Sequence, residues 1–183
     1  MRNSALLLIT FLLFIACKDD DDKGPQPPDI TYDFKLLKMD GTPATTFTEG
    51  ENFIFSFRII NASSYDVIFK GMENTYDVFR VFRLGSDNSL DDVGKPYQTT
   101  CDRIRAYDRI AASDTLFIEL PWQSFPGEYG SSATLPFCPR QTNPLPAGEY
   151  YTGFITRFAF AAGDTAPDHI TPVTEFGLRF DVE

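Results

Sequence analysis

The sequence contains few side chains that could act together as a catalytic nucleophile and base. His169 is the single histidine, and it lies beside prolines in the segment AAGDTAPDHITP. A serine or cysteine nucleophile would need this histidine as its base, and no Gly-x-Ser-x-Gly turn or equivalent motif is present to hold one. Carboxylates are plentiful but scattered, so their spacing does not place a pair of them across a cleft. The sequence therefore favours a protein that is not an enzyme.

Metal and cofactor sites are also weakly indicated. Asp87, Ser89 and Asp91 have the alternate spacing of oxygen ligands found in calcium loops, but no glycine stands at the sixth position and no glutamate at the twelfth. A solvated turn is the favoured interpretation. Two isolated cysteines and one histidine do not make a zinc site, and no glycine-rich loop is present to hold a phosphate. We expect neither a metal nor a cofactor.

The charge balance argues against nucleic acid as a partner. Asp and Glu outnumber Lys and Arg by 26 to 16, and no cluster of basic residues interrupts this excess. A polyanion would be repelled by such a field, and so would an anionic lipid surface. Any association with a membrane therefore requires a covalent or inserted anchor.

Three aromatic residues are candidates for ligand binding. Trp122, Phe125 and Tyr129 lie in the segment WQSFPGEYG, and rings held in loops can form a platform for a sugar face or a peptide. The alternative is that Trp122 ends a strand and fills the core. The sequence favours this alternative for Trp122, and less strongly for the other two rings.

The N-terminus has the features of an export signal that ends at a cysteine. Arg2 gives a positive start, residues 5–16 form an apolar run, and Cys17 follows the small residue Ala16. The run is too short to span a membrane as a helix. Residues 14–17 (FIAC) resemble the lipobox of bacterial lipoproteins, in which the cysteine receives a diacylglycerol. Residues 1–16 are then a signal peptide and Cys17 is the lipidated N-terminus; an uncleaved hydrophobic anchor and plain secretion are the alternatives.

Residues 17–29 are predicted to be a tether. KDDDDK follows Cys17 directly, and consecutive carboxylates stay solvated instead of packing in a core. This acidic run resembles the signal that sends Bacteroidetes-type lipoproteins to the outer face of the outer membrane, although DDDDK is also found in artificial tags. GPQPP extends the linker. We expect a lipid-anchored, surface-exposed protein of the outer membrane, with one folded domain over residues 30–183.

The two cysteines beyond Cys17 are predicted to form a disulfide. An exported protein is in an oxidising compartment, and Cys101 and Cys138 remain as one pair once Cys17 is assigned to lipid. Closing the loop between Cys101 and Cys138 would contribute about 3 to 4 kcal/mol to stability in the chain-entropy model.

Short alternating segments predict an all-β domain. In residues 52–60 (NFIFSFRII) alternate positions carry Phe, Phe, Phe and Ile, a period of two that no amphipathic helix has. No amphipathic helix is evident elsewhere, so about seven or eight strands in an immunoglobulin-like β-sandwich are predicted. The other strands are expected at residues 30–38, 65–70, 76–84, 96–110, 115–120, 149–160 and 175–182, with a polar loop at 85–94 and an irregular excursion at 122–144.

Two stretches resemble a known family. GENFIFSFRIINASSYDVIFKG with YDVFRV, and TLFIELPW with LPAGEYYTGF, are similar to the BsuPI-like domain, an immunoglobulin-like sandwich named for an intracellular proteinase inhibitor. The resemblance covers roughly residues 50–160 and implies that Asn61 caps a turn, that Gly148 lies in a turn, and that Tyr150 is a tyrosine corner. The passage from 122 to 148 and the cysteine pair depart from the family.

Together these features predict a cell-surface lipoprotein whose domain is a non-catalytic binding or interaction module. Its expected contacts are the membrane, through the N-terminal lipid, and a protein or glycan ligand that the sequence does not identify. Two alternatives are a proteinase inhibitor, which the BsuPI-like resemblance implies, and a glycan-binding accessory subunit.

Overall fold

The protein is an all-β, immunoglobulin-like sandwich. A computed structural model describes residues 26–73, 77–98, 107–123, 138–139 and 142–183, and no helix occurs among them. Accordingly, no helix in these ranges is long and apolar enough to cross a membrane. The strands are β1 (Ile30–Lys38), β2 (Thr46–Phe47), β3 (Phe53–Asn61), β4 (Val67–Met72), β5 (Arg80–Leu84), β6 (Leu90–Gly94), β7 (Tyr97–Gln98), β8 (Asp108–Ile110), β9 (Thr115–Pro121), β10 (Cys138–Pro139), β11 (Gly148–Thr156), β12 (Phe158–Ala161), β13 (His169–Ile170) and β14 (Thr174–Val182).

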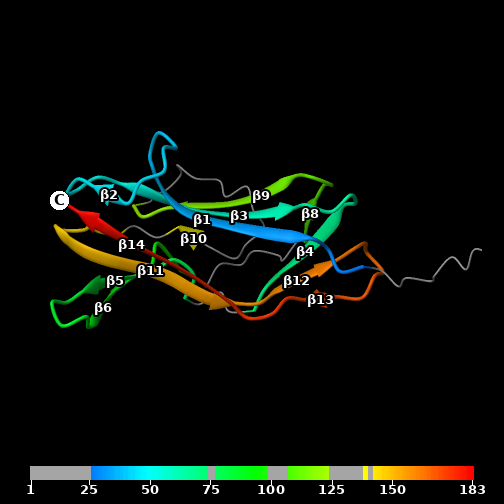
Figure 1. Ribbon diagram of the computed structural model, residues 1–183. Helices are drawn as coiled ribbons and strands as arrows, with labels where there is room; N and C mark the ends of the chain where they lie inside the picture. Colours follow the sequence, from blue (N-terminus) through cyan, green and yellow to red (C-terminus); the bar gives the residue numbers. More distant parts are fainter. Residues whose placement is uncertain (1–25, 74–76, 99–106, 124–137, 140–141) are drawn as a thin grey trace, which may run out of the picture.

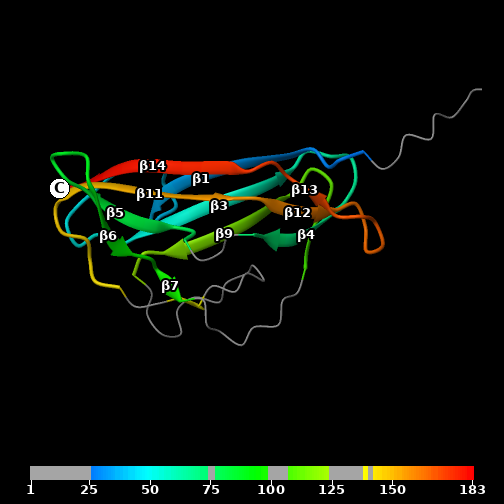
Figure 2. The same cartoon turned by 90° about the horizontal axis from the view of Figure 1, so that it is seen from below.

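The main strands form two layers (Figure 1). One layer is the three-stranded sheet β1-β3-β9. The facing layer is the five-stranded sheet β2-β14-β11-β5-β6, extended by the four-stranded sheet β13-β12-β4-β8. Figure 2 shows β14, β11, β5 and β6 side by side. Ring contacts join the layers, since Phe57 of β3 packs against Phe154 of β11 and Phe158 of β12.

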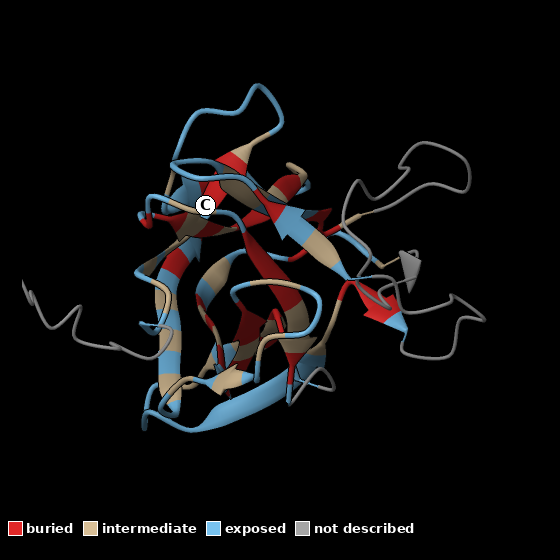
Figure 3. Ribbon diagram, turned by 90° about the vertical axis from the view of Figure 1, so that its right-hand side faces the viewer, coloured by how far each residue is buried: buried red, intermediate tan, exposed pale blue. Residues whose placement is uncertain are grey.

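The alternation in residues 52–60 has the predicted consequence. Phe53, Phe55, Phe57 and Ile59 are fully buried and point toward the facing layer. Buried residues gather between the layers, while exposed residues lie on the outside and in the loops (Figure 3). Phenylalanine is therefore the most frequent residue of the core, in keeping with the 18 phenylalanines of the sequence.

The predicted strand at 149–160 is two strands. β11 ends at Thr156, Arg157 is exposed, and β12 continues in another sheet. Alternate residues stay buried across this junction, including Phe154, Phe158 and Phe160. Because the period of two is not interrupted, the sequence carries no signal for the change of sheet.

The prediction of a loop at residues 85–94 is wrong for the second half of this segment. Residues 85–89 form the turn, but Leu90–Gly94 is β6, which pairs with β5 as a hairpin. β6 is an edge strand whose side chains are largely exposed, so it lacks the buried alternation that identifies a strand. The described ranges therefore contain more strands than the predicted seven or eight. The additional strands are β6 and short ones such as β2 and β13.

The predicted strand at 96–110 is present only at its ends. β7 and β8 occupy Tyr97–Gln98 and Asp108–Ile110, and residues 99–106 between them lie outside the described part. Of the predicted excursion at 122–144, the structure describes only residues 122–123, 138–139 and 142–144.

Asn61 has the predicted role of a turn cap. It is fully buried at the end of β3, and its side-chain amide donates to the carbonyl groups of Tyr65, Ile110 and Ala111. Its side-chain oxygen accepts a hydrogen bond from the N–H of Ser63. One polar side chain thus ties the β3–β4 turn to the segment after β8, and its burial is compensated by these bonds.

Tyr150 is a tyrosine corner, as predicted. Its side chain is fully buried, its ring stacks on Phe180, and its hydroxyl donates to the carbonyl oxygen of Pro146 at 2.7 Å. This bond fixes the loop that leads into β11, the central strand of the five-stranded sheet.

Candidate functional site

Trp122 does not belong to an exposed aromatic platform. Its side chain is 3% exposed, its ring is parallel to that of Phe53 at 6.2 Å, and its indole N–H donates to the carbonyl oxygen of Asn143. Trp122 is therefore a core residue, the alternative that the sequence favours for it, and almost none of its surface is open to a ligand. Phe125 and Tyr129 lie outside the described residues.

The other predicted site residues are described only in part. Cys17 and Cys101 lie outside the described residues, and for Cys138 the structure gives the backbone alone, which pairs with Gln98. His169 lies on β13 and lines a small cavity beside the start of the described chain. No group of three or more side chains able to hold a metal occurs in the described ranges.

In the turn that has the spacing of a calcium loop, the first carboxylate, that of Asp87, is bonded within the turn. The carboxylate of Asp87 accepts a hydrogen bond from the backbone N–H of Ser89 at 3.0 Å. Bonds from the hydroxyl and the N–H of Ser89 hold the pKa of Asp87 below its usual value. Asp91 belongs to β6. These contacts match the predicted solvated turn.

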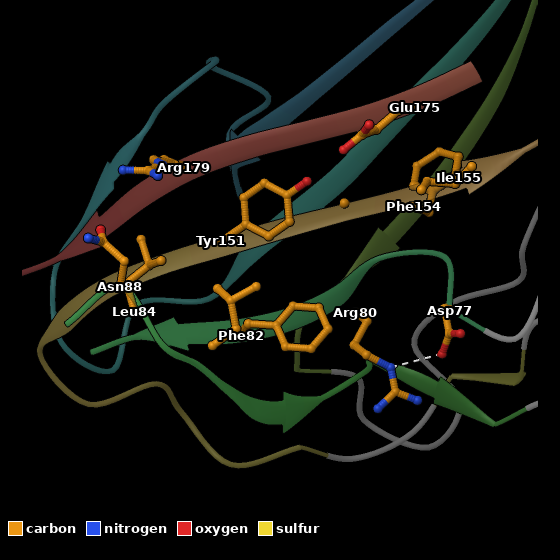
Figure 4. Close-up of a pocket in the computed structure, with 12 residues that line it drawn as sticks. Asp77, Arg80, Phe82, Leu84, Asn88, Tyr151, Phe154, Ile155, Glu175 and Arg179 are labelled. Carbon is orange, nitrogen blue, oxygen red and sulfur yellow. Dashed lines mark hydrogen bonds and ion pairs between the residues drawn. The ribbon is translucent and has the colours of Figure 1, made fainter. Parts of the chain in front are cut away.

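An open groove with a volume of about 760 Å³ lies on the outer face of the five-stranded sheet. This volume is in the range of small-molecule sites. We call it the sheet groove (Figure 4). Its lining comes from β5, β6, β11, β14 and adjoining turns: Asp77, Arg80, Phe82, Leu84, Asn88, Leu90, Tyr151, Gly153, Phe154, Ile155, Glu175 and Arg179.

Strand register places the outward-facing residues of the sheet groove in rows. Successive residues on a strand face opposite sides, so the groove receives every second residue of β11, beginning with Tyr151. Across β5, β11 and β14, one row is Phe82, Tyr151 and Arg179, and the next is Arg80, Gly153 and Gly177. Ile155 and Glu175 are paired beyond them. The second row has no side chain on two of its three strands.

Tyr151 occupies the space that the two glycines leave open. A Cβ atom at Gly153 would stand 2.6 Å from the Tyr151 hydroxyl, and one at Gly177 would stand closer still. The ring therefore lies over the glycine pair. In Figure 4 the rings of Tyr151 and Phe82 are both seen broadside on neighbouring strands. Their centroids are 6.5 Å apart and their planes differ by 34°.

The arginines of the sheet groove differ in their partners. Arg80 is engaged, because its guanidinium contacts the carboxylate of Asp77 at 2.9 Å and that of Asp92 at 2.5 Å. Arg179 and Glu175 are exposed, and neither has an ion pair or hydrogen bond to a side chain within the described residues. One cation and one anion are thus available at the rim.

The hydroxyl of Tyr151 is oriented toward Glu175 (Figure 4). Partial burial raises the pKa of Tyr151, and the negative charge of Glu175 raises it further. The hydroxyl therefore stays protonated and can donate a hydrogen bond at any physiological pH.

A second, smaller cavity of about 350 Å³ lies beside Trp122 and is lined by residues 93–95 and 142–146. The buried indole contributes little of its surface there, because Trp122 is only 3% exposed.

The comparisons with known proteins show no family for this chain. No protein-family model matches the chain, and no curated protein matches its sequence. Among solved structures, a Bordetella pertussis protein described as ApaA is 13% identical with a TM-score of 0.38, and the match covers 86% of this chain and 98% of that one. The ASH or PapD-like domain 7 of human CEP192 is 14% identical with a TM-score of 0.39, covering 88% and 91% of the two chains.

A β-glucosidase from Listeria innocua, solved with isofagomine, is 12% identical with a TM-score of 0.29, and the match covers 87% of this chain but 17% of the enzyme. At such identities and scores these likenesses carry no argument about function.

The sequence analysis did not identify the sheet groove. Its central ring, Tyr151, directly follows the core residue Tyr150, and the alternation of β11 could have shown that Tyr151 faces outward. The pairing of Gly153 with Gly177 requires the sheet register, which the sequence does not provide.

Proposed function

We propose that this protein is a lipid-anchored lipoprotein of the outer membrane surface, that its sandwich is a non-catalytic binding module, and that the sheet groove is its ligand site. The observation that carries the proposal is the groove itself, which combines two rings with a cation and an anion that have no side-chain partner among the described residues. A scaffold of packed strands holds such groups in place before the ligand arrives, which lowers the entropy cost of binding.

The position of residues 26–28 at one end of the sandwich supports a lipid anchor that is distant from the sheet groove. The carbonyl oxygen of Gln26 accepts a hydrogen bond from the hydroxyl of Tyr65, and Pro27 and Pro28 line a cavity together with His169. This is the end of the sandwich where β12 and β13 lie, and the β5–β6 hairpin is at the opposite end (Figure 1). Residues 26–28 therefore lie at the end of the sandwich opposite the β5–β6 hairpin.

The binding proposal is tested with the full lipidated chain in detergent micelles and two probe libraries: an array of neutral and anionic oligosaccharides, and phage-displayed decapeptides. We expect retention of one class of probe by the wild type and its loss in Tyr151→Ala. The matched control is Phe117→Ala, because Phe117 is a 43% exposed ring on the outer face of the other sheet. If neither library contains a probe whose retention depends on Tyr151, the sheet groove is not the ligand site.

The anchor is tested separately. We expect wild-type chain in intact cells to incorporate radiolabelled palmitate and to be degraded by added proteinase K, and Cys17→Ala to lose the label. Acyl label on the Cys17→Ala chain would refute the lipid assignment, and protection of the wild type from proteinase would refute surface exposure. We also propose that Cys101 and Cys138 form a disulfide; free thiols at both positions in a non-reduced digest of envelope protein would refute it.

A proteinase inhibitor is the second candidate, and the observation that favours it is the BsuPI-like resemblance of residues 50–160. We propose this resemblance as a family relationship, supported by the hydrogen bonds of Asn61 and Tyr150 at the positions that the resemblance marks. The same purified chain should then slow the hydrolysis of casein by a subtilisin-type proteinase. An unchanged rate at a large molar excess of the chain would leave the binding module without this activity.

A further inference from the structure

We propose that the ligand of the sheet groove is a neutral glycan, with one hexopyranose unit stacked on Tyr151 and its hydroxyl groups bonded by Arg179 and Glu175. This inference rests on the proposed function and names its ligand class.

The ring of Tyr151 is held as a flat platform. Ordinary side chains at Gly153 and Gly177 would lift it off the sheet, since their Cβ atoms would stand 2.6 Å or less from its hydroxyl. With glycine at both positions, the backbone supports one face of the ring and the other face is turned to the groove (Figure 4). The C–H groups on one side of a pyranose form a flat apolar surface that matches such a ring face.

The rim supplies hydrogen bonds of both kinds. Arg179 is the register partner of Tyr151 and offers only donors, whereas Glu175 lies two rows along and offers only acceptors. A sugar hydroxyl donates and accepts at once, so a pyranose ring can satisfy both side chains. The hydroxyl of Tyr151 adds a third polar group beside Glu175.

The rim charges also select for a neutral ligand. Arg179 and Glu175 are a cation and an anion on the same strand, and neither is neutralised by a partner within the described residues. An anionic ligand would gain from Arg179 but be repelled by Glu175, and a cationic ligand would meet the reverse. Arg80 together with its two carboxylate partners, Asp77 and Asp92, adds one net negative charge, which opposes an anionic ligand further.

The outer face of the other sheet offers a contrasting ring. Phe117 is an exposed ring on β9, and the guanidinium of Arg58 lies over it, 5.2 Å from its centroid. No cation lies over Tyr151 within the described residues. A cation already contacts one face of the Phe117 ring, whereas the side of the Tyr151 ring that is turned to the groove is open to a ligand.

The shape of the sheet groove favours a chain of sugars over an inserted side chain. The groove is open and large, and beyond the rings it continues over Leu84 and Leu90 toward the β5–β6 turn. An apolar peptide side chain gains most from a closed pocket, whereas further pyranose units can lie along an open apolar surface.

The test uses the full lipidated chain in micelles on the same two libraries. We expect binding to at least one neutral oligosaccharide of the array, weakened at least tenfold by Tyr151→Ala and about tenfold by Arg179→Ala or Glu175→Gln, as expected for a lost bond to a charged group. Binding should be unchanged in Phe117→Ala. The emission of Trp122, which is buried in the core, reports that each variant is folded.

Three outcomes would overturn the inference. Retention of peptides alone, dependent on Tyr151, refutes the glycan but keeps the sheet groove as a binding site. Selective retention of anionic glycans refutes the argument from the rim charges. Loss of any dependence on Tyr151, for both libraries, refutes the glycan and the proposed function together.

Discussion

Tyr150 and Tyr151 are adjacent on β11 but face opposite sides of the sheet. Tyr150 is fully buried, stacks on Phe180 and bonds the carbonyl of Pro146. Tyr151 is half-buried over Gly153 and makes no hydrogen bond through its hydroxyl within the described residues. The first ring completes a core, and the second has a stable position only because glycines make room for it. The neighbours on each face of the strand thus determine whether a tyrosine is enclosed in the core or lies at the surface.

The largest expected effect separates the two rings by truncation. Tyr150→Ala should lower the free energy of unfolding by about 3 to 5 kcal/mol, because it leaves a cavity in a close-packed core. Tyr151→Ala should lower it by less than about 1 kcal/mol, since the ring is not enclosed. Urea unfolding followed by the fluorescence of Trp122 measures both. Equal losses would mean that Tyr151 is a core residue and would remove the basis of the comparison.

The glycines beneath Tyr151 provide the next test. A Cβ at Gly153 would stand 2.5 Å from the backbone oxygen of Phe176, which cannot move freely, so Gly153→Ala should cost about 1 to 3 kcal/mol. At Gly177 the nearest atoms all belong to the Tyr151 ring. That ring can turn away, so Gly177→Ala should change the free energy of unfolding by no more than about 0.5 kcal/mol while shifting the ring resonances of Tyr151.

The double variant Gly177→Ala with Tyr151→Ala is the control for this pair. The three atoms nearest to a Cβ at Gly177 all belong to the Tyr151 ring, so without that ring a methyl group at Gly177 has room, and the two changes together should be no worse than Tyr151→Ala alone. A further loss of stability in the double variant would show that Gly177 has a role apart from making room for the ring.

The sequence predicts the inner side of the sandwich better than the outer side. The alternation in β3 identifies its four buried apolar residues, and the segment LPAGEYYTGF marks Tyr150, because both signals are local. The preference for Trp122 as a core residue was also correct, since the apolar strand β9 leads directly into it.

The candidate site could not be predicted in the same way. Its rows join Phe82 of β5, Tyr151 of β11 and Arg179 of β14, and only the register of the sheet brings these residues together. The β6 edge of the sheet was missed as well, because exposed edge strands have no buried face to impose a pattern. A surface site assembled from distant strands therefore leaves little trace in the sequence.

Removing one hydroxyl should change the free energy of unfolding by a smaller amount, and again more at Tyr150 than at Tyr151. Tyr150→Phe eliminates the donor to the Pro146 carbonyl and should lower the free energy of unfolding by about 1 kcal/mol. Tyr151→Phe should leave stability unchanged, because that hydroxyl has no protein acceptor within the described residues. Thermal and urea unfolding of the two variants, run side by side, decide the matter; a loss in Tyr151→Phe as large as in Tyr150→Phe would reveal a structural bond at the groove.

The smallest effect concerns ionisation. Burial raises the pKa of both tyrosines, but the charge of Glu175 acts on Tyr151, whereas Arg83 lowers and Glu49 raises the pKa of Tyr150. Glu175→Gln removes a negative charge that opposes the phenolate of Tyr151, so the pKa of Tyr151 should fall toward the ordinary value of about 10. The pKa of Tyr150 should not change.

The same change should be visible in stability at high pH. Unfolded chains ionise their tyrosines near pH 10, while folded Tyr151 keeps its proton to higher pH, so its contribution to stability is complete below about pH 10 and is lost as the pH rises through the folded pKa. Glu175→Gln should make this loss smaller. Alkaline titration of ring-labelled tyrosine by NMR measures both pKa values, and an equal shift of Tyr150 and Tyr151 would place Glu175 away from the groove hydroxyl and contradict the rim that the glycan inference requires.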